Sequence, residues 1–170
     1  MEANKLPEPW LRGTLAEVRA VPRAVLHALE LAREDLQRWC GALSDAELNA
    51  RPAGIAPVAF HVRHIARSVD RLLTYAEGNQ LSDAQIAKMK SELDPDARRE
   101  ELFAELDTAL QKGAARIRAF DVGRFNEARA VGKQELPTTL GGLLVHVADH
   151  TQRHVGQAVT TAKIVLGQVR

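Results

Sequence analysis

Apolar residues recur along most of this chain at intervals of three and four, the period of an α-helix with one buried face. The clearest stripe follows residue 14 and comprises Leu15, Val18, Val21, Val25, Leu29, Ala32 and Leu36. Runs that alternate apolar and polar residues, as half-buried strands do, are absent from the sequence. The pattern therefore predicts long helices over about 14–39, 57–77, 97–120 and 138–166, with a short helical piece over 82–93.

Local signals mark where these helices begin. Pro22 either begins the first long helix or kinks it, because proline lacks an amide donor and clashes with the preceding turn. Ser44, with Glu47 three residues later, is a capping-box signature for one short helical turn. Polar residues before the later helices are expected to cap them: Ser82, Asp96, and Thr138 or Thr139.

Two segments lack a helical period. Residues 51–57 are predicted to form a loop, and residues 121–137 form a connection punctuated by Gly123, Gly132 and Pro137. A connection of that length is uncommon in a compact bundle and is more often functional than accidental. We therefore expect these two segments to frame the open end of the bundle and to supply residues that contact a substrate.

The fold class follows from the helix count. Four long amphipathic helices around one core define an all-α, four-helix bundle with short extra helical turns. The chain has 170 residues, which is the size of one domain, so we predict a single domain over residues 1–170. Hydrophobic residues make up 45% and charged residues 26%, ordinary globular values that argue against overall disorder.

Charge gives no indication of a polyanionic partner. Lys and Arg total 23 against 22 Asp and Glu, a formal net charge of +1. The second helix carries a basic stripe, Arg63, Arg67 and Arg71, which we interpret as a solvated face paired with neighbours such as Asp70 and Glu77. We therefore expect no binding to nucleic acid and no association with a membrane.

Other features favour a cytoplasmic protein. The first residues lack a basic end followed by an apolar run, so we expect no signal peptide. No stretch approaches the ~20 apolar residues that span a bilayer. The single cysteine, Cys40, cannot form an internal disulfide, which suits a reducing compartment. We interpret Cys40 as a small buried apolar group rather than a nucleophile.

The histidines are the candidate chemistry. His146, His150 and His154 step by four along the fourth helix, and such pairs can offer two imidazole nitrogens to one metal ion. A helical wheel turns His150 and His154 towards the apolar face and His146 towards the flank. On the second helix the same wheel favours His61 over His64 as a third ligand.

Two alternative interpretations of the histidines do not involve a metal. Histidines spaced by four also arise by chance, and a partly buried histidine is usually satisfied by one hydrogen bond. His27, on the first helix, has no ligand type near it in sequence and is interpreted as structural or solvent-facing.

Several motifs resemble those of the DinB-like superfamily, which includes DinB and YfiT-like proteins. Residues 60–66 are similar to its second-helix histidine segment, and His150-Thr151-Gln152-Arg153-His154-Val155-Gly156-Gln157 to its H-x-x-x-H-x-G-Q signature. Residues 136–144 and 51–57 resemble its approaches to the last and second helices. The resemblance extends from the first helix to Val165 and implies a four-helix bundle, often a homodimer, that holds a divalent metal.

Carried over by motif, the metal ligands are His64, His150 and His154. The resemblance thus selects His64 where the wheel favours His61, and a site near the mouth of a bundle need not lie on the centre of the buried stripe. Many members carry an acidic residue directly after the first histidine of the pair, whereas this chain has Thr151. Imidazole ligands suit zinc, nickel, iron or copper, so the identity of the metal stays open.

Three neutral imidazoles leave at least one coordination position open, which is typical of a catalytic centre. Two chemistries fit a small-molecule substrate: hydrolysis of an ester or amide, and attack by a low-molecular-weight thiol. The resemblance implies both, because the superfamily includes transferases that use bacillithiol or mycothiol and members described as metal-dependent hydrolases. The alternative is a non-catalytic, stress-related interaction module with a vestigial or structural metal, in which Trp10 and Trp39 serve a dimer face.

Overall fold

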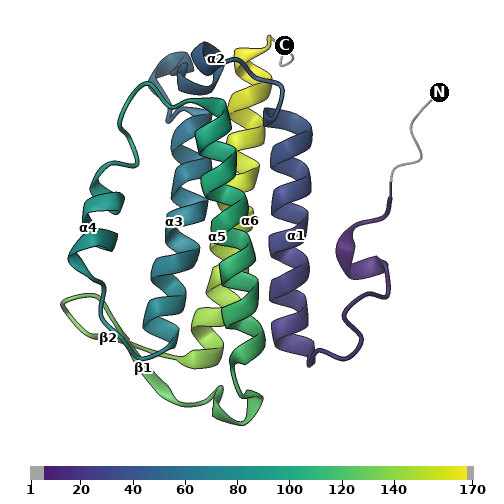
Figure 1. The fold of residues 1–170 in the computed structure, drawn as a ribbon, viewed down its shortest axis with the longest axis vertical. Helices are drawn as coiled ribbons and strands as arrows, with labels where there is room; N and C mark the ends of the chain where they lie inside the picture. The colour runs from purple at the N-terminus through teal and green to yellow at the C-terminus, as the bar shows by residue number, and fades with distance from the viewer. Residues whose placement is uncertain (1–5, 168–170) are drawn as a thin grey trace.

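The computed structural model describes residues 6–167, and four long helices run side by side along its longest axis (Figure 1). These helices are α1 (Ala20–Cys40), α3 (Val58–Ala76), α5 (Arg99–Ala119) and α6 (Leu140–Val165). The shorter elements are α2 (Asp45–Asn49), α4 (Asp83–Lys90), and 3₁₀ turns at Pro9–Leu11, Pro52–Gly54 and Val122–Arg124. Two strands, β1 (Ala128–Val131) and β2 (Leu136–Thr139), form one hairpin.

The core lies between the apolar faces of the long helices. Each helix packs against two others in the order α1, α6, α3, α5 and back to α1. Fully buried side chains come from all four: Leu36, Ile65, Leu106 and Leu144 are among the largest. The predicted all-α four-helix bundle with short extra helical turns is confirmed.

Helix α1 begins at Ala20, six residues later than its apolar stripe predicts. Pro22 lies in its first turn and so begins the helix rather than kinking it, since a first-turn proline loses no intrahelical hydrogen bond. The preceding segment leaves the helical region at Leu15, where φ is +57°. Arg12 nevertheless ties this segment to α1 through ion pairs with Glu30 and Glu34.

The predicted caps at Ser44, Ser82 and Thr139 are confirmed, because each side chain accepts a hydrogen bond from a backbone amide of its helix. The expected cap at Asp96 is wrong. Asp96 has a φ of +63°, and α5 begins at Arg99. The Arg99 amide donates to Asp45 Oδ1 of α2, so a carboxylate from another helix takes the place of a local cap.

The connection over residues 121–137 contains an element that the sequence pattern does not predict. Strands β1 and β2 pair antiparallel, with Ala128 opposite Thr139 and Val131 opposite Leu136. Arg129 on β1 donates from Nε to the carbonyl of Ala76, so the hairpin packs against the carboxyl end of α3. Figure 1 shows the hairpin at one end of the bundle and α2 at the other.

The single cysteine and the two tryptophans differ in how deeply they are buried. Cys40 is fully buried, and burial raises the pKa of its thiol to about 12, which confirms the interpretation as an apolar group. Trp39 is partly buried, with Lys163 against its ring. Trp10 is 60% exposed.

No helix within residues 6–167 has the length and apolar character needed to cross a membrane. Residues 1–5, which bear on the signal-peptide expectation, lie outside the described part.

Candidate metal centre

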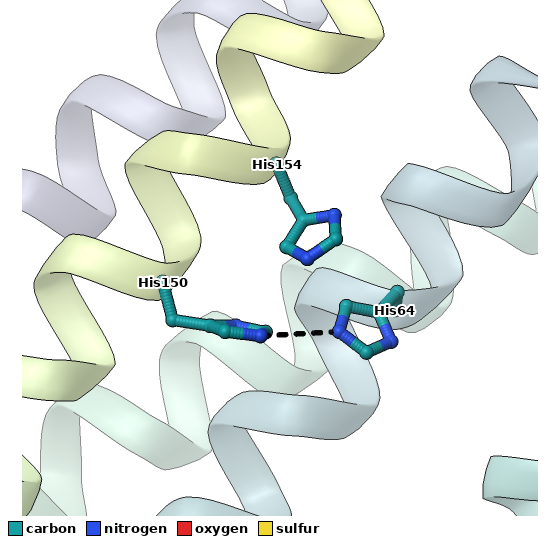
Figure 2. Close-up of side chains that lie close together, drawn as sticks. All are labelled: His64, His150 and His154. Carbon is teal, nitrogen blue, oxygen red and sulfur yellow. Dashed lines mark hydrogen bonds between the residues drawn. The ribbon is translucent and has the colours of Figure 1, made fainter. Parts of the chain in front are cut away.

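The packing of α3 against α6 brings together three histidines that are far apart in sequence. His64 comes from the first half of α3, and His150 and His154 come from successive turns of α6 (Figure 2). One ring nitrogen of each lies within 4.8 Å of the others. His64 Nε2 and His150 Nε2 lie 3.3 Å apart. The three half-buried rings point into one small space between the two helices.

This donor set fits a transition-metal ion. Metal–nitrogen bonds of about 2.0–2.1 Å at a tetrahedral angle place two ligand nitrogens about 3.3 Å apart. The observed separation between His64 Nε2 and His150 Nε2 has that value. His150 Nδ1 is buried and has no hydrogen-bond partner within residues 6–167, whereas Nε2 of the same ring faces His64.

His64 is held from behind by a carboxylate. Its Nδ1 lies 2.6 Å from Oε2 of Glu92, in the turn that follows α4. Burial alone raises the pKa of Glu92, but hydrogen bonds from His64 and Arg71 outweigh it and hold the pKa below its usual value. The ionised carboxylate can only accept, so His64 donates its Nδ1–H, and in the neutral ring this leaves the lone pair on Nε2. That lone pair faces His150 and is available to a metal.

His154 is held by a second histidine. His61 lies one turn before His64 on α3, is 5% exposed, and its Nδ1 lies 3.1 Å from Nδ1 of His154. If His154 donates this hydrogen bond, its Nε2 keeps the lone pair that a metal needs. The wheel thus identifies His61 correctly as buried, but within the described residues the cluster of possible ligands contains His64 instead.

Three imidazoles of the cluster, those of His61, His150 and His154, are kept neutral near neutral pH. Burial lowers the pKa of His61, His150 and His154 to about 4 in each case. Repulsion between the rings adds to this effect: His64 and His154 lower the pKa of His61, and His64 lowers the pKa of His150 and His154. Neutral imidazole is the form that ligates metals, so these rings need not lose protons near neutral pH before they bind an ion.

The other histidines lie outside the triad. His146 is 46% exposed at its side chain, and its ring centroid lies 5.3 Å from that of His150. His27 is buried on α1 and lies 3.1 Å from Thr14 Oγ1, which supports the structural interpretation. Thr151 is 1% exposed, so its side chain faces the core rather than solvent.

Sequence reasoning missed Glu92 and misread Arg71. Glu92 lies 28 residues from His64 in a turn without a periodic pattern, and no local signal connects the two. Arg71 is 9% exposed and paired with Glu92, so the Arg63–Arg67–Arg71 stripe is not a solvated face. A signal did exist for Arg71, because it follows His64 by seven residues, and residues seven apart lie two turns apart on the same face of a helix.

The surroundings of the site differ from the expected frame. The 3₁₀ turn Pro52–Gly54 contacts α6 and leads into the end of α3 that carries His61 and His64. The hairpin over β1 and β2 instead contacts Ala76. At a rise of 1.5 Å per residue, Ala76 lies about 18 Å from His64 along α3. The expectation that residues 51–57 and 121–137 together frame one open end of the bundle is therefore wrong, because the hairpin packs at the opposite end of α3.

The fold and the converging imidazoles define a class: helical-bundle proteins with a histidine cluster suited to a metal ion. Residues 28–158 match the DinB superfamily, so this chain belongs to that superfamily. The chain is also similar to a solved structure described as "YfiT from Bacillus subtilis is a probable metal-dependent hydrolase with an unusual four-helix bundle topology". The two share 18% identity with a TM-score of 0.63, over 89% of this chain and 91% of that one, which shows a common fold. No curated protein matches the chain.

Proposed function

We propose that this protein binds one divalent transition-metal ion through His64, His150 and His154 and uses it as an enzyme on a small molecule. The observation that carries the proposal is the convergence of three half-buried imidazoles from two helices within 4.8 Å of one another. Zinc, nickel and iron all accept such ligands. Three protein ligands are the number found in catalytic centres, whereas structural zinc sites are closed by four.

Hydrolysis of an ester or amide is the reaction that we propose first. When bound, the ion supplies Lewis acidity at a position that the protein leaves open. The triad contains no carboxylate, so the ligands themselves do not neutralise the +2 charge. The description of YfiT as a probable metal-dependent hydrolase supports this choice by analogy of fold.

Transfer of a low-molecular-weight thiol is the second candidate. The same all-imidazole triad favours it, because an ion that keeps its full charge also favours the ionised form of a thiol. The resemblance to thiol transferases of the superfamily also supports thiol transfer. It also predicts a homodimer, which analytical ultracentrifugation would test directly.

Metal content per chain tests the ligand set. Protein purified without a nickel column should hold about one ion per chain in the wild type and lose it in His64→Ala and His154→Ala. His146→Ala is the matched control on the same helix as His154, and it should keep the ion because His146 lies outside the triad. A wild type that binds neither zinc nor nickel after incubation would overturn the proposal and favour the interaction module.

Activity assays then separate the two reactions. The metal-loaded wild type should hydrolyse a panel of esters and amides, lose this activity with a chelator and regain it with the ion. Thiol conjugation to electrophiles, measured with bacillithiol and mycothiol, would instead support the transferase. Equal turnover by wild type and His64→Ala in either assay would refute a metal-dependent reaction at this site.

A further inference from the structure

Three arginines on α3 form hydrogen bonds with the last turn of α4 and the residues that follow it. Arg63 donates to the carbonyl of Asp94, and Arg67 donates to the carbonyl of Lys88 and to Ser91 Oγ. Arg71 donates from Nη1 to Glu92 Oε1 at 2.6 Å. Residues four apart lie along one face of a helix, so the row holds the whole segment over residues 88–94 against α3.

Glu92 is the one side chain of this segment that reaches a candidate ligand. Its two oxygens are divided: Oε1 accepts from Arg71 and Oε2 accepts from His64 at 2.6 Å. Arg71 and Glu92 are 9% and 5% exposed, which makes them a nearly buried ion pair. Such pairs are weak sources of stability, because desolvation offsets their attraction, so a specific positioning role is the better explanation.

We propose that Glu92, held in place by Arg71, is a positioning residue that fixes the Nδ1–H tautomer of His64 and turns its Nε2 towards His150 and His154. This inference rests on the proposed function, since it assigns a purpose to the tautomer that metal binding needs. A carboxylate behind a metal-binding histidine both orients the ring and raises its basicity. Here the short helix α4 and the arginine row deliver that carboxylate from outside the four long helices.

Glu92→Gln gives a sharp test because Arg71 dictates which way the new amide faces. Arg71 can only donate, so the amide oxygen turns to Arg71 and the NH₂ group turns to His64. His64 Nδ1 must then accept, which moves the ring proton to Nε2, the atom facing His150. The substitution therefore selects the wrong tautomer for ligation without changing the size of the side chain.

The double variant Arg71→Met and Glu92→Gln should reverse this effect. Without the arginine, the amide is free to turn its oxygen to His64 and accept the Nδ1–H again. Metal binding should thus be stronger in the double variant than in Glu92→Gln alone. A merely structural role for the buried pair predicts the opposite, because a second disruption of the same pair cannot restore what the first removed.

Two measurements test the inference on the full chain. Long-range ¹H–¹⁵N NMR of the metal-free protein reads the tautomer of His64 directly: Nδ1–H in the wild type and the double variant, and Nε2–H in Glu92→Gln. Competition with a chelator gives the affinity for Co²⁺ and Zn²⁺, which should fall about 10–100-fold in Glu92→Gln and recover in part in the double variant. Glu105→Gln, which breaks the neighbouring pair with Arg67, is the matched control and should change neither readout.

The outcomes distinguish this inference from the proposed function. If the wild type binds Co²⁺ and Zn²⁺ but Glu92→Gln binds them equally well with an unchanged tautomer, the positioning role is refuted and the ligand set stands. If the wild type binds neither ion, the proposed function fails. In that case the NMR result still decides whether Glu92 sets the tautomer of His64.

Discussion

Acidification should destabilise the metal-free protein through His61. This ring is 5% exposed between α3 and α6, and burial together with the nearby His154 and His64 lowers its pKa to about 4, from 6.5. Between these two values the unfolded chain binds a proton that the folded protein does not. Stability therefore falls as the pH falls through 6.5, and this loss levels off below about 4.

The magnitude follows from the two pKa values. Integrating the proton difference for His61 from pH 7 to pH 4 gives a loss of about 3 kcal/mol in the free energy of unfolding. The steepest part lies near pH 5, where this one group contributes about 1.2 kcal/mol per pH unit. That is a large share of the roughly 5–15 kcal/mol by which a domain is stable.

Urea unfolding followed by circular dichroism, with a chelator present and at intervals from pH 7 to pH 4, measures this loss. His61→Leu replaces the ring by an apolar group and should flatten the curve by about 1.2 kcal/mol per pH unit near pH 5. Val147→Ala, a buried change on α6 without a titratable group, should lower stability at every pH and leave the slope unchanged. Parallel curves for wild type and His61→Leu would refute the reasoning.

Three further outcomes are expected from the packing and from the proposed site. Saturating zinc at about 100 times its dissociation constant should stabilise the wild type by about 2.7 kcal/mol, seen as a higher Tm, and should leave the Tm of His64→Ala unchanged. Gly156→Ala should raise stability by about 0.5–1 kcal/mol in urea titrations, since a Cβ there meets open space, whereas Gly113→Ala should lower it by about 1–3 kcal/mol because its Cβ would lie 2.8 Å from Val69 Cγ1. Leu36→Ala, at a fully buried position of α1, should cost about 2–5 kcal/mol by the same measurement.

The long helices were predictable because each buries one stripe over many turns. Even so, the apolar stripe overstates α1, since Leu15 and Val18 pack against the core from a segment that is not helical. A period of three to four residues shows which side chains are buried, but it does not show that the backbone between them is helical. The proline in the first turn was the better guide to where α1 begins.

The sequence pattern does not predict the β1–β2 hairpin, for a different reason. Each strand has four residues, too few for an alternating pattern to stand out, and Pro137 lies within β2. Its place is set by a contact distant in sequence, the hydrogen bond from Arg129 to the carbonyl of Ala76. Local propensity carries no information about such a contact, so the segment reads as an irregular connection.

The candidate ligands show a similar limit. The spacing of His150 and His154 indicates a pair on one face of a helix. Both residues lie on α6, and both belong to the histidine cluster. His64 was selected only by its resemblance to the DinB-like motif, because the wheel favoured His61. The DinB superfamily match supports that resemblance, and the proximity of His64 to the pair gives it a geometric basis.

The helical wheel failed for His64 because it measures only the distance from the centre of an apolar stripe. His64 lies on the flank of α3, where Glu92 from the segment over residues 88–94 forms a hydrogen bond with its ring. A ligand needs a lone pair in a defined direction, and a polar partner such as Glu92 provides that direction, whereas an apolar contact does not. His61, nearer the centre of the stripe, is correspondingly the ring that packs behind His154. On α3, therefore, the histidine that meets the pair on α6 lies on the flank, where Glu92 reaches its ring, whereas on α6 the pair itself lies towards the apolar face.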